Sequence, residues 1–253
     1  MTAAARIRRP APIPGRGEFW SWLLRDQRAV VLLAAFIALN DLAFIAVHIA
    51  GELVGSRNAL LFVDTDRGYA EVFQYLKLAF VLLLVVVLAV ERRSWRMLAW
   101  LPPFAYLLAD DALRIHEDGG LIAAELLGLE AALGLRARDF GEIVVSLAAG
   151  GACLVLLVVA YFFADRRERW LFRALTALVA LLAVFGIGLD LVHQAVSGGA
   201  TGLDWLAVAE DGGEMIVVTL MVVLLLRANL TGGAPALAAP EARPDAASEG
   251  DPA

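Results

Sequence analysis

The residues with the clearest potential for chemistry are the three histidines of the chain. They are His48, His116 and His193. Asp41 precedes the first of them by seven residues and Asp190 precedes the third by three, so each of these pairs shares one face of a helix. Asp111 precedes the second by five residues, which separates the two side chains unless the helix unwinds there. Neutral imidazole and carboxylate oxygens together suit zinc, iron or manganese.

A second set of acids opens three apolar segments with a similar pattern. Residues 139–142 and 211–214 both read Asp-x-Gly-Glu and are followed by apolar runs, and Glu71 begins a weaker copy of the same pattern. The repeated unit is a helix, an outer connection and a second helix. The sequence therefore predicts three helical hairpins that bring their acids and histidines to the same side.

These two sets define a predicted divalent-metal site. Its candidate ligands are His48, His116, His193, Asp41, Asp111, Asp190, Glu71, Glu142 and Glu214. In an enzyme, metal-bound water would be the nucleophile or oxidant site, and Glu142, Glu214 or Asp41 would be the general base. The competing structural interpretation is that acids in a first turn stabilise the helix dipole, while Arg114 neutralises its acidic neighbours locally.

Lys77 is the only lysine, beside 20 arginines. It lies six residues past Glu71, about 9 Å along a helix at 1.5 Å per residue, which is too deep for its side chain to reach the outer surface easily. Asp41 is expected at a similar depth if the first hairpin is antiparallel. We predict a buried Lys77–Asp41 ion pair. A Schiff-base lysine for an aldehyde cofactor such as retinal is the weaker alternative.

The elements that must position these residues are membrane helices. Hydrophobic residues make up 60% of the 253 positions and charged residues 19%, and the mean hydropathy is +0.73. Soluble domains are less apolar, and a bilayer core needs about 20 apolar residues per helix. We predict an all-α bundle of six transmembrane helices. They lie near residues 29–51, 70–90, 97–115, 141–163, 171–195 and 208–227. Pro102-Pro103 is expected to kink or break the third helix.

The basic residues predict the orientation. Of the 21 Lys and Arg, 15 lie before the first helix, after the last one, or in the 2–3 and 4–5 connections. Such loops face the cytoplasm, so both termini are expected there, in a bacterial-type inner membrane. The opposite side holds 18 of the 27 acids and is expected to concentrate cations.

The acids and histidines lie in the outer halves of the helices, whereas the inner halves are almost wholly apolar. A transporter needs polar groups along the whole route, so a one-sided binding or catalytic site is favoured. A cation or proton-coupled transporter and an accessory subunit of a membrane complex remain alternatives. The expected partners are the bilayer and a small cationic or neutral ligand or a lipid at the outer leaflet. A membrane subunit or a second copy of the chain is a further expected partner.

The remaining segments are predicted to be peripheral. Residues 1–28 form an expected cytoplasmic leader rich in Arg and Pro, and residues 228–253 an expected disordered tail. Residues 119–135 are expected to form an amphipathic helix on the outer surface or over the polar site. The single cysteine, Cys153, excludes an internal disulfide, and no basic patch indicates nucleic-acid binding.

Overall fold

The protein is all-helical over the residues that the structure, a computed structural model, describes. These are residues 28–132, 134–196 and 204–230. Within them the only β-type pairing is an isolated bridge between Ala132 and Leu135. Residues 1–27 of the predicted leader and 231–253 of the predicted tail lie outside the described residues, whereas Arg28 and residues 228–230 are helical.

Five helices are long and apolar enough to cross a membrane, with mean hydropathy between 1.8 and 2.7 in their most apolar windows. They are α2 (Arg28–Val54), α3 (Tyr69–Arg92), α6 (Ala137–Phe163), the continuous α7–η3–α8 helix, and α9 (Trp205–Leu230). The prediction of an all-helical protein with several helices able to cross a membrane is confirmed. Each helix extends a few residues beyond its predicted bounds.

The third predicted helix, over residues 97–115, is divided. A 3₁₀ segment, η2 (Trp95–Trp100), leads into α4 (Leu101–Leu113), which has 13 residues and is too short to count with the five. Pro102 and Pro103 lie in the first turn of α4, where a missing N–H group removes no helical hydrogen bond. The prolines therefore begin the α-helix and mark the predicted break.

The helix also unwinds where α4 meets the next element. Arg114 adopts a left-handed conformation with φ of 56°, and α5 (Ile115–Leu127) starts immediately after it. This change of direction brings His116 back toward the end of α4. The end of α5 is likewise a left-handed residue, Gly128, with φ of 62°.

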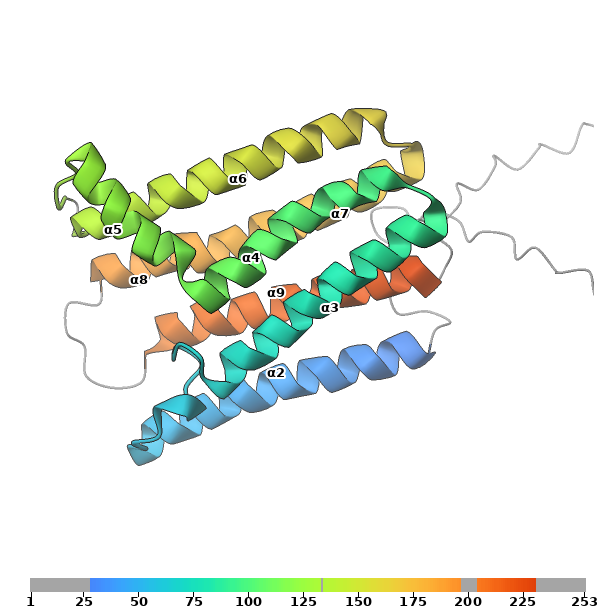
Figure 1. The fold of residues 1–253 in the computed structure, drawn as a ribbon. Helices are drawn as coiled ribbons and strands as arrows, with labels where there is room; N and C mark the ends of the chain where they lie inside the picture. The colour runs from blue at the N-terminus through green and yellow to red at the C-terminus, as the bar shows by residue number, and fades with distance from the viewer. Residues whose placement is uncertain (1–27, 133, 197–203, 231–253) are drawn as a thin grey trace, which may run out of the picture.

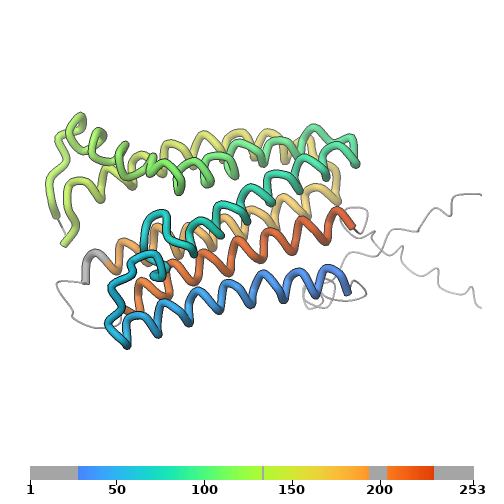
Figure 2. The backbone as a smooth tube through the Cα atoms, turned by 60° about the horizontal axis from the view of Figure 1, so that its bottom comes forward, coloured from blue at the N-terminus to red at the C-terminus, as the bar shows by residue number. Residues whose placement is uncertain are grey.

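The long elements run antiparallel along the bundle, with α9 at its centre (Figures 1 and 2). α9 packs against α2, α3 and α7 (Arg166–Ala183), and it is the most buried of the long helices. α2 begins and α9 ends at the same end of the bundle, whereas α5 and α8 (Asp190–Val196) lie at the opposite end. We call these the Arg-rich end and the acidic end.

The core is most tightly packed at the Arg-rich end. Trp100 stacks on Phe104 with ring centroids 5.4 Å apart, and Phe172 lies 5.6 Å from Trp100. All three side chains are essentially inaccessible to solvent. They pack in the same cluster as the buried valine, methionine and leucine side chains of α9. This end of the bundle is therefore filled by apolar packing.

Two features reduce the contact between helices toward the acidic end. α7 continues into α8 through a π-helical segment, η3 (Val184–Leu189), whose wider turn shifts the register of the side chains that follow. α6 contacts α5 at one end and η2 at the other but has few contacts with α7. Only 6% of the apolar window of α6 is buried.

Candidate functional site

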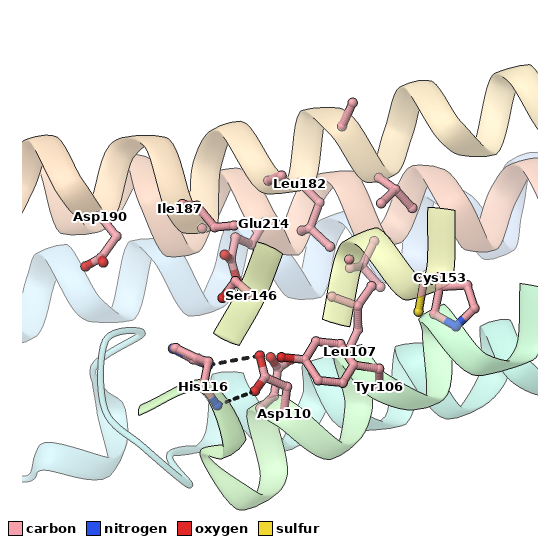
Figure 3. A pocket seen from close by; sticks show the side chains of 18 of the residues that line it. Tyr106, Leu107, Asp110, His116, Ser146, Cys153, Leu182, Ile187, Asp190 and Glu214 are labelled. Carbon is pink, nitrogen blue, oxygen red and sulfur yellow. Dashed lines mark hydrogen bonds and ion pairs between the residues drawn. The ribbon is translucent and has the colours of Figure 1, made fainter. Parts of the chain in front are cut away.

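A cavity of about 390 Å³, here called the main cavity, lies among α3, α4, α6, α7 and α9 (Figure 3). One end is polar and the other is apolar. The polar lining includes Asp110, Asp111, His116, Asp139, Glu142, Ser146, Asp190 and Glu214. The apolar lining includes Leu78, Trp100, Leu107, Leu154, Leu157, Val179, Leu182 and Val218.

Close contact between α5 and α6 fixes the polar end. A Cβ atom on Gly141 would overlap the carbonyl group of Gly120, so the two helices meet at their backbones. Beyond this contact α6 stays separated from α7, and Glu142 and Ser146, four residues apart, both face the cavity. The helix crossing therefore holds α6 in the position that leaves the cavity open.

His116 pairs with Asp110, the residue before the Asp111 whose spacing from His116 does not place them on one helix face. One carboxylate oxygen of Asp110 accepts the backbone N–H of His116 at 2.7 Å, and the other lies 2.9 Å from the ring Nδ1 (Figure 3). The left-handed Arg114 makes this return possible. The hydrogen bond to Asp110 raises the pKa of His116, although partial burial opposes the shift. The hydroxyl of Tyr106 points toward the same carboxylate.

Two further acids of the polar end are neutralised by arginines. Asp139 accepts hydrogen bonds from the side chain and backbone of Arg136 at 2.7 Å, and Glu142 pairs with Arg138 at 2.5 Å. Glu117 on α5 joins Arg114 and Arg138. Burial works against it, but these two arginines hold the pKa of Glu117 below its ordinary value. The network ties α5 to the start of α6.

A second, smaller cavity of about 110 Å³ adjoins the main cavity, and its lining is dominated by acids. It is lined by Val63, Asp64, Thr65, Asp66, Ala70, Glu71, Gln74, Asp111, Asp211, Glu214 and Met215. Gln74, Asp111 and Glu214 line both cavities, and we call these three residues the junction.

The junction offers side-chain oxygens that accept no hydrogen bond from the described residues. Gln74 is 6% exposed, and its side-chain oxygen is buried with no hydrogen-bond partner among the described residues. The carboxylates of Asp111 and Glu214 likewise accept no hydrogen bond and form no ion pair within the described part of the chain. A buried acceptor that lacks a donor costs about 1–3 kcal/mol. The junction is therefore suited to a group that supplies several donors.

His48 and His193 lie outside both cavities. His48 is buried, and its Nδ1 accepts the backbone N–H of Val63 at 3.1 Å, so it fixes the α2–α3 connection. The ring of His193 lies 2.7 Å from Asp204 and 3.3 Å from Glu210, and it links α8 to the start of α9. Only His116 of the three faces the main cavity.

The described residues contain no group of three or more His, Cys, Asp or Glu side chains placed to hold a metal ion. Five of the nine predicted ligands line the main cavity: Asp111, His116, Glu142, Asp190 and Glu214. Glu71 lines only the smaller one. The structure thus brings most of the predicted acids together but separates the histidines, and metal binding stays a prediction.

Lys77 and Asp41 form the predicted buried ion pair, 2.7 Å apart. Lys77 also donates to the backbone carbonyl of Met215 at 2.8 Å and to Thr219 at 3.3 Å, and Thr219 donates to Asp41 at 2.5 Å. All three ammonium donors are used. This arrangement supports a structural role in joining α2, α3 and α9, and it disfavours Lys77 as an attachment point for an aldehyde cofactor.

Sequence reasoning missed Gln74, Asp110 and Trp100. The signal for Gln74 was present, because an amide inside an apolar membrane segment usually faces the bundle interior. Asp110 was not chosen as a candidate ligand over its neighbour Asp111, because helical spacing alone does not show that the helix unwinds at Arg114. Trp100 was not identified because a tryptophan near a helix end is typical of the membrane interface.

The fold and the cavities define an all-helical protein with several helices able to cross a membrane. The chain belongs to the family described as a domain of unknown function, DUF8692, whose model matches residues 27–228. No curated protein and no solved structure matches the chain.

Proposed function

We propose that the protein is a membrane protein of six transmembrane segments that binds a cation at the acidic end of its main cavity, on the extracytoplasmic side. The observation that carries this proposal is the convergence of acids from four helices on one cavity, where the junction oxygens accept no hydrogen bond from the described residues. An acidic, partly enclosed site concentrates cations and strengthens their binding.

The sixth segment is formed by η2 and α4. Six residues at about 2.0 Å and 13 residues at about 1.5 Å give a length of about 32 Å, which matches a hydrocarbon core about 30 Å thick. With this segment the chain makes six antiparallel passes. The Arg-rich end then faces the cytoplasm.

A one-sided binding site is favoured over a transport route. Beyond the main cavity, the Arg-rich end is filled by Trp100, Phe104 and Phe172 together with apolar residues of α9. The polar groups of the cavity lining lie toward the acidic end, apart from isolated groups such as Thr176. A transporter needs polar groups that continue to the far side.

Two kinds of cation fit the acceptors of the junction. An organic ammonium uses its N–H donors, and a zinc, iron or manganese ion uses carboxylate oxygens with His116 as the nearest imidazole of the cavity. A bound metal would polarise a water or a substrate oxygen, and the protein would then be a metal-dependent enzyme. The ammonium is favoured because the described residues hold no group arranged for a metal.

The proposal is tested by calorimetric titration of the protein in lipid nanodiscs with propylammonium, Zn²⁺ and Mn²⁺, and by elemental analysis after growth with these metals. We expect saturable binding of at least one cation, weakened about tenfold or more by Glu214→Gln because a charge-assisted contact is lost. The matched control is Asp118→Asn, an acid on α5 outside both cavities. Equal binding by the two variants, or no saturable binding, overturns the proposal.

A further inference from the structure

The main cavity has an apolar arm that a small cation does not need. From the junction it extends past Leu107, Leu182 and Val218 to Trp100. Asp111 and Leu101 are ten residues apart on α4, which corresponds to about 15 Å along the helix axis. Between them α6 and α7 contribute Leu154, Leu157 and Val179 to the lining. The cavity is thus an elongated space with an acidic head and an apolar tail.

The head of this space matches one chemical group closely. Gln74, Asp111 and Glu214 offer three acceptor groups, one amide oxygen and two carboxylates, and a primary ammonium carries three N–H donors. Gln74 is more than nine-tenths buried, it lines the cavity, and its side-chain oxygen has no hydrogen-bond partner among the described residues. This observation is independent of the acidic residues around it. The two carboxylates supply the opposite charge. Charge-assisted hydrogen bonds of this kind are about twice as strong as neutral ones.

The far end of the arm contains a second unpartnered group. Trp100 is fully buried, and its indole N–H has no acceptor among the described residues. Leu107 and Leu157, which line the arm with it, offer no polar side-chain atom. An occupant that fills the arm therefore ends close to Trp100, whose fluorescence can report its presence.

We propose that the ligand of the main cavity is a single-chain amphiphile with a primary ammonium head, held by the junction, and an alkyl tail that fills the arm as far as Trp100. This inference rests on the proposed cation-binding function and names its ligand class. A membrane is the natural source of such a molecule, because it dissolves the tail and presents the amine at the surface. The sequence predicted either a small cationic or neutral ligand or a lipid as partner. The proposed molecule combines a cationic head with a lipid-like tail.

The test uses a long-chain amine whose position in the arm is visible. Dodecylamine that carries bromine at its far end is added to the protein in nanodiscs, and quenching of tryptophan fluorescence is recorded, since bromine quenches only by close contact. The matched probe is the corresponding brominated alcohol, which has the same tail and no charge. Propylammonium serves as a head-group competitor. The variants are Trp100→Phe, Glu214→Gln and, as a control, Glu125→Gln on α5.

We expect saturable quenching by the amine that is absent with the alcohol, is largely lost in Trp100→Phe, and needs about tenfold more amine in Glu214→Gln. Glu125→Gln should behave as wild type. If Trp100→Phe does not fold, the difference between amine and alcohol and the effect of Glu214→Gln still decide the matter.

The outcomes separate the two proposals. Equal quenching by the amine and the alcohol overturns the ammonium head. Binding of propylammonium without quenching by the brominated amine overturns the tail and leaves the cation-binding function in place. Failure of both probes to bind removes the proposed function together with this inference.

Discussion

Two polar regions of the bundle contain acidic side chains. In one region the acid is paired with donors of the fold, and in the other it is not paired with any described residue. At the contact of α2, α3 and α9, Asp41 meets Lys77 and Thr219, and the ammonium has all three donors occupied. At the junction, Asp111 and Glu214 have no donors from the described residues. A polar group that is satisfied within the fold stabilises it, whereas acceptors without donors are available to a ligand. The comparison supports the junction as the binding region of the proposed function.

The largest expected effect comes from breaking the satisfied region. Lys77→Met leaves Asp41 buried with no opposite charge, and loss of one partner of a buried pair costs about 3–5 kcal/mol. We expect this loss in the free energy of unfolding, measured by denaturant titration in mixed micelles. The double variant Lys77→Met, Asp41→Leu should recover most of it. A single variant as stable as wild type would show that the pair is not a structural lock.

The second effect concerns the helix crossing that keeps the main cavity open. Gly141→Ala places a methyl group against the carbonyl of Gly120 and must push α5 away from α6. Overpacking of this kind costs about 1–3 kcal/mol. Gly151→Ala, on the same helix with nothing within 4 Å, should instead stabilise by about 0.5–1 kcal/mol, because alanine favours a helix. Thermal unfolding of the two variants with opposite signs supports the crossing, and equal shifts contradict it.

The third prediction is a gain in the free energy of unfolding, whereas the first is a loss. Glu214 lines the smaller cavity together with Asp111 and Asp211, so three acidic side chains lie close together inside the bundle. Glu214→Gln keeps the shape and removes the charge, so the unliganded protein should become more stable by about 1 kcal/mol while it loses cation binding. Thermal unfolding with and without propylammonium measures both changes. A destabilised Glu214→Gln protein would indicate that this acid has a structural partner, as Asp41 does.

The sequence predicted the helices and the buried Lys77–Asp41 pair. It did not predict which acids form ion pairs and which line a cavity. Long apolar runs are typical of membrane helices, and Lys77 and Asp41 could be matched by depth alone. A shared site for the three histidines was one interpretation of the sequence, because they lie at the same ends of their helices. Their partners instead come from connections and a neighbouring helix, through Val63, Asp204 and Glu210, which helical spacing does not encode.

The main cavity also lay beyond sequence reasoning for a physical reason. It depends on how far α6 stands from α7, and this distance is set by the Gly120–Gly141 contact and by the π-helical turn η3. The pattern of apolar residues along each helix identifies buried faces but not the separation of two helices. Gln74 and Trp100 gain their roles only from that separation.

The smallest expected effect is the pH dependence of stability from the Asp110–His116 pair. This pair resembles the Lys77–Asp41 contact because its charges are paired, and it resembles the junction because it faces the main cavity. The pKa of His116 is raised above 6.5 by Asp110. Because folding raises this pKa, the stabilisation is fully present below about pH 6.5 and is lost as the pH rises through the raised value.

Glu117 and Glu142 also face this ring and favour its charged form, so His116→Gln should remove a pH-dependent contribution that the other acids do not replace. The contribution is expected to be about 1 kcal/mol or less, since the ring is 35% exposed and partly screened by solvent. Unfolding free energies of wild type and His116→Gln, measured from pH 5 to pH 9, should differ more at the acidic end of this range and converge toward its alkaline end. A constant difference across the range would mean that His116 contributes through packing and not through its charge.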